Sequence, residues 1–469
     1  MKHHTILVLC LLIGWFSASG ARAQPVESPI LARVAWGHAI QTALPIYARL
    51  RDAAGEDAAL VIAPRAQLQI ANVPYRILDT DARADEYIIA RARRPGARAD
   101  AAQLVAILDD AGKHIVARAS PAQADTLAMH SFDLRRVSTP IILRAPSRVM
   151  SAPNAMPDPA IATMIAQVQS SVAVNYVSQL SGQTPATIGG AAYTLATRHT
   201  NSGTPIQKAT QFAYEFLQAR GLVPSYHNWN ACGSANRNVI AQKTGATLPN
   251  EIVLVTAHLD DLPSGAVAPG ADDNASGATG VLIAAQILSA HQFKRTIRFV
   301  FFTGEEQGLC GSAAYANLVA GQGANIVAVY NMDMLAWDTV NGPTLRLYTR
   351  ALDDPGYAAD LAIANVFIAV VNNYALSGNL APILDQDVDG VSDHASFWNR
   401  GYAGILTIED DWNDFNDFYH TTNDTVAHIN ATYFTNYLKA SVGTLAHLAE
   451  YVAPIDRLRF LPFIFKSGQ

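Results

Sequence analysis

The sequence predicts an α/β protein with a three-layer α/β/α domain built on a mostly parallel sheet. Two observations predict this organisation. From residue 238 onward, short apolar, β-branched runs alternate with longer runs whose apolar residues recur at helical spacing. Such strand–loop–helix repetition is typical of parallel strands covered by helices on both faces. The chain has 469 residues, more than one core normally supports, so we expect a second domain before the sheet.

Residues 1–23 predict a signal peptide. Lys2 lies in a short polar stretch, Thr5–Phe16 is apolar, and Ala21-Arg22-Ala23 fits the small-x-small cleavage rule, so the mature chain is expected to begin near Gln24. No later stretch is apolar over the length needed to span a bilayer. We therefore expect an exported, soluble protein, either extracellular or periplasmic.

Residues 24–150 predict an N-terminal α+β domain. Strand-like runs occur at Tyr87–Ala92, Leu104–Leu108, Ile115–Arg118 and Thr139–Leu143. The region is either an accessory domain or a pro-region that assists folding or blocks a site until it is removed. Residues 151–160 lie in a Pro-, Ser- and Ala-rich stretch typical of a linker. Residues 161–453 would form the main domain, and 454–469 an apolar, basic tail to which the residues assign no role.

The main domain opens with helices and then alternates. Helical spacing of apolar residues predicts helices over Pro159–Leu180 and Ile206–Gly221. Four strands and two further helices follow in alternation, at Asn238–Gln242, Ile252–Ala257, Ala275–His291, Ile297–Thr303, Gly311–Ala320 and Ile326–Met332. This order supports the parallel sheet.

Composition narrows the function classes. Half of the residues are hydrophobic and 15% are charged, which is typical of a globular protein and not of a disordered one. The net charge is −6 and no basic block occurs, which argues against nucleic acid as the main partner. After cleavage of the signal only Cys232 and Cys310 remain. They either pair in an oxidising compartment or stay two separate buried thiols.

Histidine and acidic residues follow three of the predicted strands. His258 and Asp260 follow the strand at Ile252–Ala257, Glu305 and Glu306 follow the next, and Asp333 ends the last. Ligands of parallel sheets bind at these carboxyl ends. Zinc accepts imidazole nitrogen and carboxylate oxygen, and a pair of zinc ions needs one shared carboxylate. The candidate ligand set is His258, Asp272, Glu306, Asp333 and His420.

The motifs around these residues resemble those of the secreted bacterial leucyl aminopeptidase family, which are co-catalytic two-zinc exopeptidases related to aminopeptidase Y. The resemblance covers roughly residues 160–450, and the motifs come in the family's order. They are Ala257–Asp260, Pro269–Gly277, Gly304–Leu309, Asn331–Met334, Ser392–Ser396 and His420–Thr422.

The resemblance implies a metallo-aminopeptidase with two zinc ions per chain. His258, Asp272 and Asp333 would hold one ion; Asp272, Glu306 and His420 would hold the other, with Asp272 as the bridge. The peptide between Asp272 and Asp273 would be cis. Asp260 would orient the ring of His258. Glu305 would be the general base for a hydroxide that bridges the zinc ions.

The expected substrates are peptide or protein N-termini, and we expect a monomer. Met334, Phe415 and Tyr419 are candidates for an apolar pocket that prefers a large hydrophobic first residue such as leucine. The acidic stretch with Asp385, Asp387 and Asp389 supports two alternatives: a calcium site, although position 396 is not the glutamate of an EF-hand, or a rim that favours basic residues.

Three rival functions remain open. A carboxypeptidase or aminoacylase could use the same metal pair, although no arginine pair for a substrate carboxylate is evident in the sequence. A non-catalytic binding domain would have lost ligands, whereas all five and Glu305 are present. A single-zinc acyltransferase resembling glutaminyl cyclase would differ in metal stoichiometry.

Overall fold

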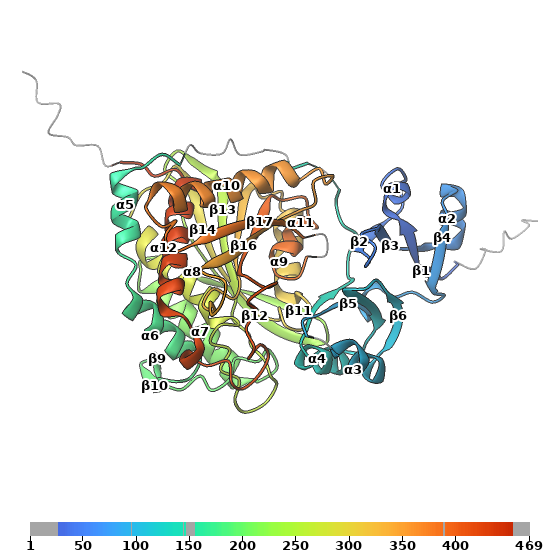
Figure 1. The fold of residues 1–469 in the computed structure, drawn as a ribbon, viewed down its shortest axis with the longest axis horizontal. Coiled ribbons are helices and arrows are strands. Elements are labelled where there is room, and N and C mark those ends of the chain that lie inside the picture. Colours follow the sequence, from blue (N-terminus) through green and yellow to red (C-terminus); the bar gives the residue numbers. More distant parts are fainter. Residues whose placement is uncertain (1–26, 95, 144, 147–154, 388–389, 454–469) are drawn as a thin grey trace, which may run out of the picture.

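A computed structural model describes residues 27–94, 96–143, 145–146, 155–387 and 390–453. The expected signal peptide, most of the expected linker and the tail lie outside the described residues. Figure 1 shows a smaller N-terminal part, coloured blue to teal, beside a larger domain that contains the main sheet. In the described part of the chain, no helix combines the length and the apolar character needed to cross a membrane.

The main sheet has eight strands in the order β11-β12-β14-β13-β15-β18-β16-β17. Their bounds are β11 Ser225–Ala231, β12 Ser234–Lys243, β13 Leu248–His258, β14 Arg295–Phe302, β15 Ile326–Met332, β16 Thr344–Thr349, β17 Ala381–Gln386 and β18 Gly404–Glu409. The central strands β14, β13, β15 and β18 pair in parallel. The carboxyl ends of these four strands therefore meet at one edge of the sheet.

Helices cover both faces of this sheet (Figure 1). One layer contains α5 Pro159–Ala166, α6 Ser170–Leu180, α7 Thr204–Gln218, α8 Ala275–Leu288, α10 Tyr357–Asn373 and α12 Ala431–Leu448; the other contains α9 Cys310–Gly321 and α11 His394–Trp398. Side chains of β13 alternate between the layers. Val253 and Val255 join the core under α8, whereas Ile252 and Leu254 pack with α9. Successive side chains point to opposite faces of the sheet, and both faces are covered by helices. This explains why the strand is a continuous hydrophobic run.

The N-terminal part consists of two four-stranded antiparallel sheets. One has the order β2-β3-β1-β4 and the other β6-β7-β5-β8. The strands are β1 Pro29–Ala35, β2 Ile46–Arg51, β3 Asp57–Pro64, β4 Tyr75–Asp79, β5 Tyr87–Ala92, β6 Ala106–Asp110, β7 His114–Arg118 and β8 Phe132–Arg136. A shared apolar cluster that includes Leu60 and Ile89 joins the sheets. Helices α1 Trp36–Ala39 and α2 Arg65–Ala71 pack with the first sheet, and α3 Ala97–Leu104 and α4 Pro121–Met129 pack with the second.

The α/β class and the predicted strands and helices of the main sheet are confirmed, as is the additional N-terminal domain with antiparallel sheets. One predicted strand is wrong: Thr139–Leu143 does not form a strand. Its backbone instead bridges the two parts of the chain, because the Ile141 N–H donates to the carbonyl of Ile46 and the Ile142 N–H donates to that of Asn399. The helix predicted over Pro159–Leu180 is two helices, α5 and α6.

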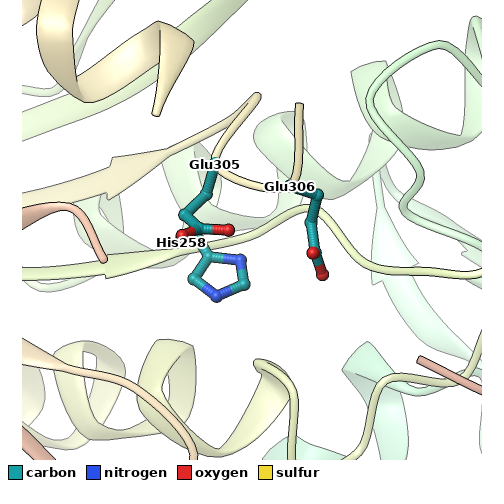
Figure 2. A group of neighbouring side chains, drawn as sticks. All are labelled: His258, Glu305 and Glu306. Carbon is teal, nitrogen blue, oxygen red and sulfur yellow. The ribbon is translucent and has the colours of Figure 1, made fainter. Parts of the chain in front are cut away.

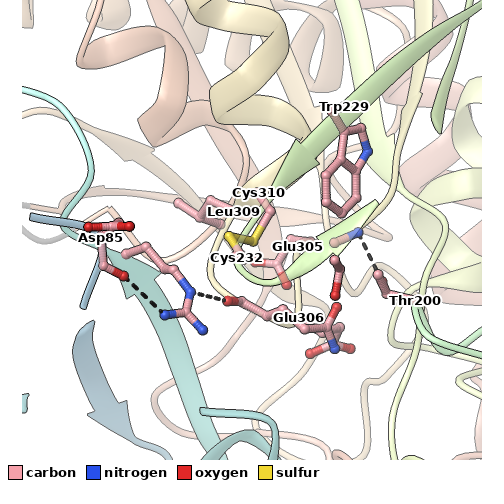
Figure 3. The surroundings of a disulfide bond; sticks show 12 residues. Asp85, Thr200, Trp229, Cys232, Glu305, Glu306, Leu309 and Cys310 are labelled. Carbon is pink, nitrogen blue, oxygen red and sulfur yellow. Dashed lines mark hydrogen bonds between the residues drawn. A yellow bond between two sulfur atoms is a disulfide. The ribbon is translucent and has the colours of Figure 1, made fainter. Parts of the chain in front are cut away.

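Cys232 and Cys310 form a disulfide. Cys232 lies with Gly233 in the turn between β11 and β12, where both residues have positive φ angles, as the tightest hairpin turns require. Cys310 is the first residue of α9. Figure 3 shows the disulfide beside the loop that carries Glu305 and Glu306. The disulfide therefore fixes the hairpin turn to the segment that follows this loop.

Candidate metal centre

The carboxyl edge of the main sheet gathers the predicted site residues. His258 is the last residue of β13, Glu305 and Glu306 follow β14, and Asp333 follows β15. Figure 2 shows Glu305 and Glu306 on their loop, with the ring of His258 beside them. His420 comes from the segment between β18 and α12. These residues are distant in sequence, and the parallel strand order brings them together.

Two groups of ligand atoms share one aspartate, Asp273. Nε2 of His258 lies 3.1 Å from Asp333 Oδ1 and 3.3 Å from Asp273 Oδ1. Nε2 of His420 lies 2.9 Å from Glu306 Oε2 and 3.2 Å from Asp273 Oδ2. Within each group the ligand atoms lie within 4.8 Å of one another. Two divalent ions that share one carboxylate need this arrangement.

The structure corrects the expectation for Asp272. Its carboxylate points away from the cluster, accepts a hydrogen bond from the Ala336 N–H at 2.8 Å and accepts another from the Asn416 amide at 3.1 Å. Asp273, one residue further, provides the shared carboxylate instead. The cis peptide is also one residue later than expected, between Asp273 and Asn274. Two adjacent aspartates before a helix look alike in sequence, and only the backbone path decides which of them faces the cluster.

The protonation of both histidines fits a metal site. Nδ1 of His258 lies 3.1 Å from the carbonyl oxygen of Asp260, and Nδ1 of His420 lies 2.6 Å from that of Ala128. A carbonyl only accepts, so each Nδ1 carries a hydrogen and donates it. Each Nε2, in a neutral ring, then presents a lone pair to carboxylate oxygens that also only accept. Either a proton on Nε2 or a metal ion between these atoms resolves this conflict, and a hydrogen bond from Nδ1 to a carbonyl is typical of metal-binding histidines.

The charges of the cluster also favour bound metal cations. Four buried carboxylates, those of Asp273, Glu305, Glu306 and Asp333, surround two imidazoles. Burial and the carboxylate of Asp273 raise the pKa of Glu306 to about 8. Burial lowers the pKa of His420, but the carboxylates of Glu306 and Asp273 outweigh it and raise this pKa to about 10. A buried excess of negative charge is costly without a cation, so the donor set fits two zinc ions.

Asp260 supports the loop of Glu305 and Glu306. Its carboxylate accepts the hydroxyl of Thr200 at 2.8 Å, the Glu305 N–H at 3.4 Å and the Glu306 N–H at 3.3 Å. The same carboxylate lies 3.8 Å from Nδ1 of His258, farther than the carbonyl of Asp260. The contact between Asp260 and His258 thus runs mainly through the backbone, and the side chain places the acidic loop.

Three residues behind the cluster had no role in the sequence interpretation. The carboxylate of Asp424 accepts the N–H groups of Asp272 and Asp273, between 2.9 and 3.1 Å. Glu409 and Asn416 contact the carboxylate of Asp272. No sequence motif identifies these three residues. Glu409 is the last residue of β18, however, so it lies at the carboxyl end of a parallel strand, as His258, Glu306 and Asp333 do.

A cavity of ≈ 20 Å³ lies beside the cluster. Its lining includes His258, Asp273 and Glu305, together with Met334 and Tyr419, both expected in the substrate pocket. Phe415, the third expected pocket residue, packs against the ring of Tyr419 with 4.9 Å between centroids. Arg93, Asp133 and Leu134 of the N-terminal domain also line this cavity.

The N-terminal domain contacts the cluster directly. The carbonyl of Ala128, in α4, accepts from the ring of His420. Asp125 lies 3.1 Å from Nε2 of His199 and accepts from the side-chain amide of Gln307 at 3.0 Å. Arg136 donates to the carbonyl of Gln307, the residue after Glu306. This domain therefore packs directly against the residues around the cluster.

The acidic stretch expected to bind calcium has other contacts. Arg346 pairs with Asp385 at 2.6 Å, and the carboxylate of Asp387 accepts the N–H groups of Gly390 and Val391. Asp389 lies outside the described residues. Among the described residues, this stretch forms no cluster of metal-ligand atoms.

The α/β sheet, with one aspartate shared between two groups of histidine and carboxylate ligands, thus holds a candidate centre for two metal ions.

Residues 238–444 match the family model described as Peptidase family M28. A probable aminopeptidase of Saccharomyces cerevisiae is 29% identical over 232 residues, which cover 46% of this chain and 58% of that protein. Leucine aminopeptidase 1 of Uncinocarpus reesii is 30% identical over 220 residues, covering 44% and 54%. The chain thus spans somewhat over half the length of these relatives.

A solved structure confirms the fold. The LapA aminopeptidase of Legionella pneumophila superposes with a TM-score of 0.60 over 78% of this chain and 99% of its own, at 19% sequence identity. At this identity, the similarity speaks for the α/β architecture and not for the reaction.

Proposed function

We propose that the chain belongs to Peptidase family M28 and is a two-zinc aminopeptidase, which hydrolyses the N-terminal peptide bond of peptides and proteins. One observation carries this proposal: two ligand groups share Asp273, with Glu305 beside them, within the segment that matches the family. His258, Asp273 and Asp333 would hold one ion; Asp273, Glu306 and His420 would hold the other. Bound zinc supplies Lewis acidity toward a carbonyl and toward water.

Residues of the chain itself would transfer the proton from the attacking water to the leaving amine. The carboxylate of Glu305 would take a proton from the attacking water and return it to the leaving amine. The hydrogen bonds that Asp260 accepts from the Glu305 and Glu306 N–H groups hold this loop against β13. The carbonyl of Asp260 would keep the ring of His258 in the tautomer that presents Nε2, and in the uncut chain the carbonyl of Ala128 does the same for His420.

Recognition of an amine is favoured over recognition of a carboxylate. In the described cavity, the one guanidinium is that of Arg93, which belongs to the N-terminal domain and is already paired with Asp133 and Asp411. A carboxypeptidase or aminoacylase would need a cation there for its substrate. The apolar walls formed by Met334, Phe415 and Tyr419 support a large first residue such as leucine.

We further propose that the protein is a secreted monomer and that residues 24–150 are an inhibitory pro-region. The disulfide supports an oxidising compartment outside the cytoplasm. The contacts of Ala128, Asp125 and Arg136 with the site support inhibition, because they occupy the space that a substrate would need.

The experiment combines metal analysis with hydrolysis of leucyl-p-nitroanilide and its N-acetylated form, before and after proteolysis between residues 147 and 154. We expect about two zinc ions per chain, release of nitroaniline only from the free amine, and a faster rate after proteolysis. Chelation should abolish the activity, and zinc should restore it. Equal cleavage of both compounds would contradict an aminopeptidase.

A further inference from the structure

A buried arginine of the N-terminal domain enters the substrate cavity. Arg93 follows β5, and only 6% of its side chain is exposed. It lines the same cavity as His258 and Asp273. Its guanidinium lies 5.1 Å from the ring centre of Phe415 and donates to Asp411 Oδ2 at 2.7 Å. A long cationic side chain therefore fills the space beside the metal cluster.

Its partner, Asp411, belongs to the main domain. Asp411 follows β18, and its carboxylate is fully buried. Oδ1 accepts the hydroxyl of Tyr348 at 2.7 Å and lies 3.7 Å from Arg346, whose Nε bonds Asp410. In the described part of the chain, the cations within 4 Å of Oδ2 belong to the N-terminal domain: Arg93 at 2.7 Å and Arg91 at 3.6 Å. Removal of that domain would leave Oδ2 without a cation.

The walls around this carboxylate are apolar. Seven side chains form one cluster here: Met334, Tyr348, Val391, Leu406, Ile408, Phe415 and Tyr419. Five of them line the cavity together with the metal-binding residues: Met334, Val391, Leu406, Ile408 and Tyr419. Apolar walls next to a carboxylate suit a side chain with an aliphatic stem and a cationic tip.

The ion pair between Arg93 and Asp411 does more than hold the two domains together. Arg93 already has a partner within its own domain, because its Nε donates to Asp133 at 2.6 Å. Removal of the domain would therefore leave this arginine paired, whereas Oδ2 of Asp411 would face solvent in the opened pocket and would be buried again, without a cation, under any apolar substrate side chain. Leaving a buried charge unpaired costs far more than a surface ion pair gains. A cation from the substrate would remove this cost.

We propose that Asp411 is a specificity-determining residue, and that the pocket in which Arg93 now lies receives a lysine or arginine side chain at the N-terminus of the substrate. This inference rests on the proposed aminopeptidase function and names its substrate class. Arg93 occupies the pocket in the full chain as a substrate arginine would. Leucine still fits the apolar walls, but it leaves Oδ2 unpaired.

The kinetic test compares lysyl-, arginyl- and leucyl-p-nitroanilide, using zinc-loaded chain cut at a protease site engineered into residues 147–154. We expect kcat/KM for the basic substrates to be at least roughly tenfold higher than for the leucyl substrate. The reason is that a desolvated ion pair stabilises the bound substrate more than the contact of one additional methylene group does. Asp411→Asn should lower kcat/KM for the basic substrates roughly 100-fold and leave leucine within about threefold. Asp417→Asn removes the same charge from an exposed position of the same segment and is the matched control.

A binding test on the uncut chain needs no turnover. Arg93→Ala empties the pocket, so L-argininamide should raise the melting temperature of this variant more than L-leucinamide does. The difference should vanish in Arg93→Ala/Asp411→Asn. Equal effects of the two amides, or equal losses for leucyl and lysyl substrates in Asp411→Asn, would overturn the proposal. If argininamide binds through Asp411 but no anilide is cleaved, the aminopeptidase function fails while the cation pocket stands.

Discussion

Asp272 and Asp273 are neighbours with opposite orientations. The carboxylate of Asp273 lies between two histidines at 3.2–3.3 Å, while that of Asp272 accepts a backbone N–H and a side-chain amide on the far side. Asp424 holds both by accepting their N–H groups. A carboxylate that faces two imidazoles stabilises cations, whereas one that faces N–H donors stabilises the loop. The same residue type therefore performs two tasks at adjacent positions.

This difference predicts different outcomes for two isosteric changes. Asp273→Asn should remove bound zinc, because an amide is a poor bridging ligand and its NH₂ group would face the metals. Asp272→Asn should keep zinc, since its amide oxygen still accepts from Ala336, and should cost about 1–3 kcal/mol of stability. Zinc content and denaturant unfolding measure the two effects. Loss of zinc in Asp272→Asn alone would return the bridging role to that residue.

Glu305 permits a second prediction at this scale. Glu305→Gln keeps the size of the side chain but cannot take a proton. We expect zinc content within error of the wild type and a kcat lower by roughly 10²–10⁴-fold, the usual contribution of a general base. Zinc analysis alongside leucyl-anilide kinetics makes the comparison. A kcat near that of the wild type would exclude Glu305 from proton transfer.

At the scale of elements, the sequence predicted four of the eight strands of the main sheet and single strands of the N-terminal domain, but not how the sheets of that domain pair. Strands β12 to β15 were predictable because each is a buried apolar run, and the rule that ligands follow the carboxyl ends of parallel strands located His258, Glu306 and Asp333. Asp411 follows β18 and fits the same rule, but the strand itself was not recognised. The pairing of two antiparallel sheets, and the position of Arg93 over the site, depend on contacts between distant segments that no local pattern encodes.

The disulfide gives a prediction for the β11–β12 hairpin. It closes a loop of 78 residues between the hairpin turn and α9. Changing both Cys232 and Cys310 to Ser should lower the free energy of unfolding by about 2–4 kcal/mol, because the unfolded chain gains freedom. Urea unfolding, with and without reductant, measures this change. Reductant should destabilise the wild type but not the double variant; equal sensitivity of both would mean that the bond contributes nothing.

At the scale of the whole molecule, the N-terminal domain and the main domain share one polar network. Tyr419 donates to Asp133 at 2.7 Å, and Arg93 connects Asp133 to Asp411. The carbonyl of Ala128 holds the ring of His420. The candidate metal centre of the uncut chain is therefore partly built by the domain that covers it. Zinc binding and inhibition should depend on the same interface.

Weakening this interface should activate the uncut chain. Arg93→Ala/Asp133→Ala removes the buried ion pair but leaves the main domain unchanged, so the N-terminal domain should detach more often and the rate on leucyl-p-nitroanilide should rise roughly tenfold or more. Arg94→Ala/Asp100→Ala is the matched control, since it removes an ion pair of the same domain whose side chains are 54% and 43% exposed. Gel filtration after proteolysis shows whether the domains separate. If the uncut wild type is already as active as the cut protein, the N-terminal domain does not slow hydrolysis. It would then be an accessory domain and not an inhibitory pro-region.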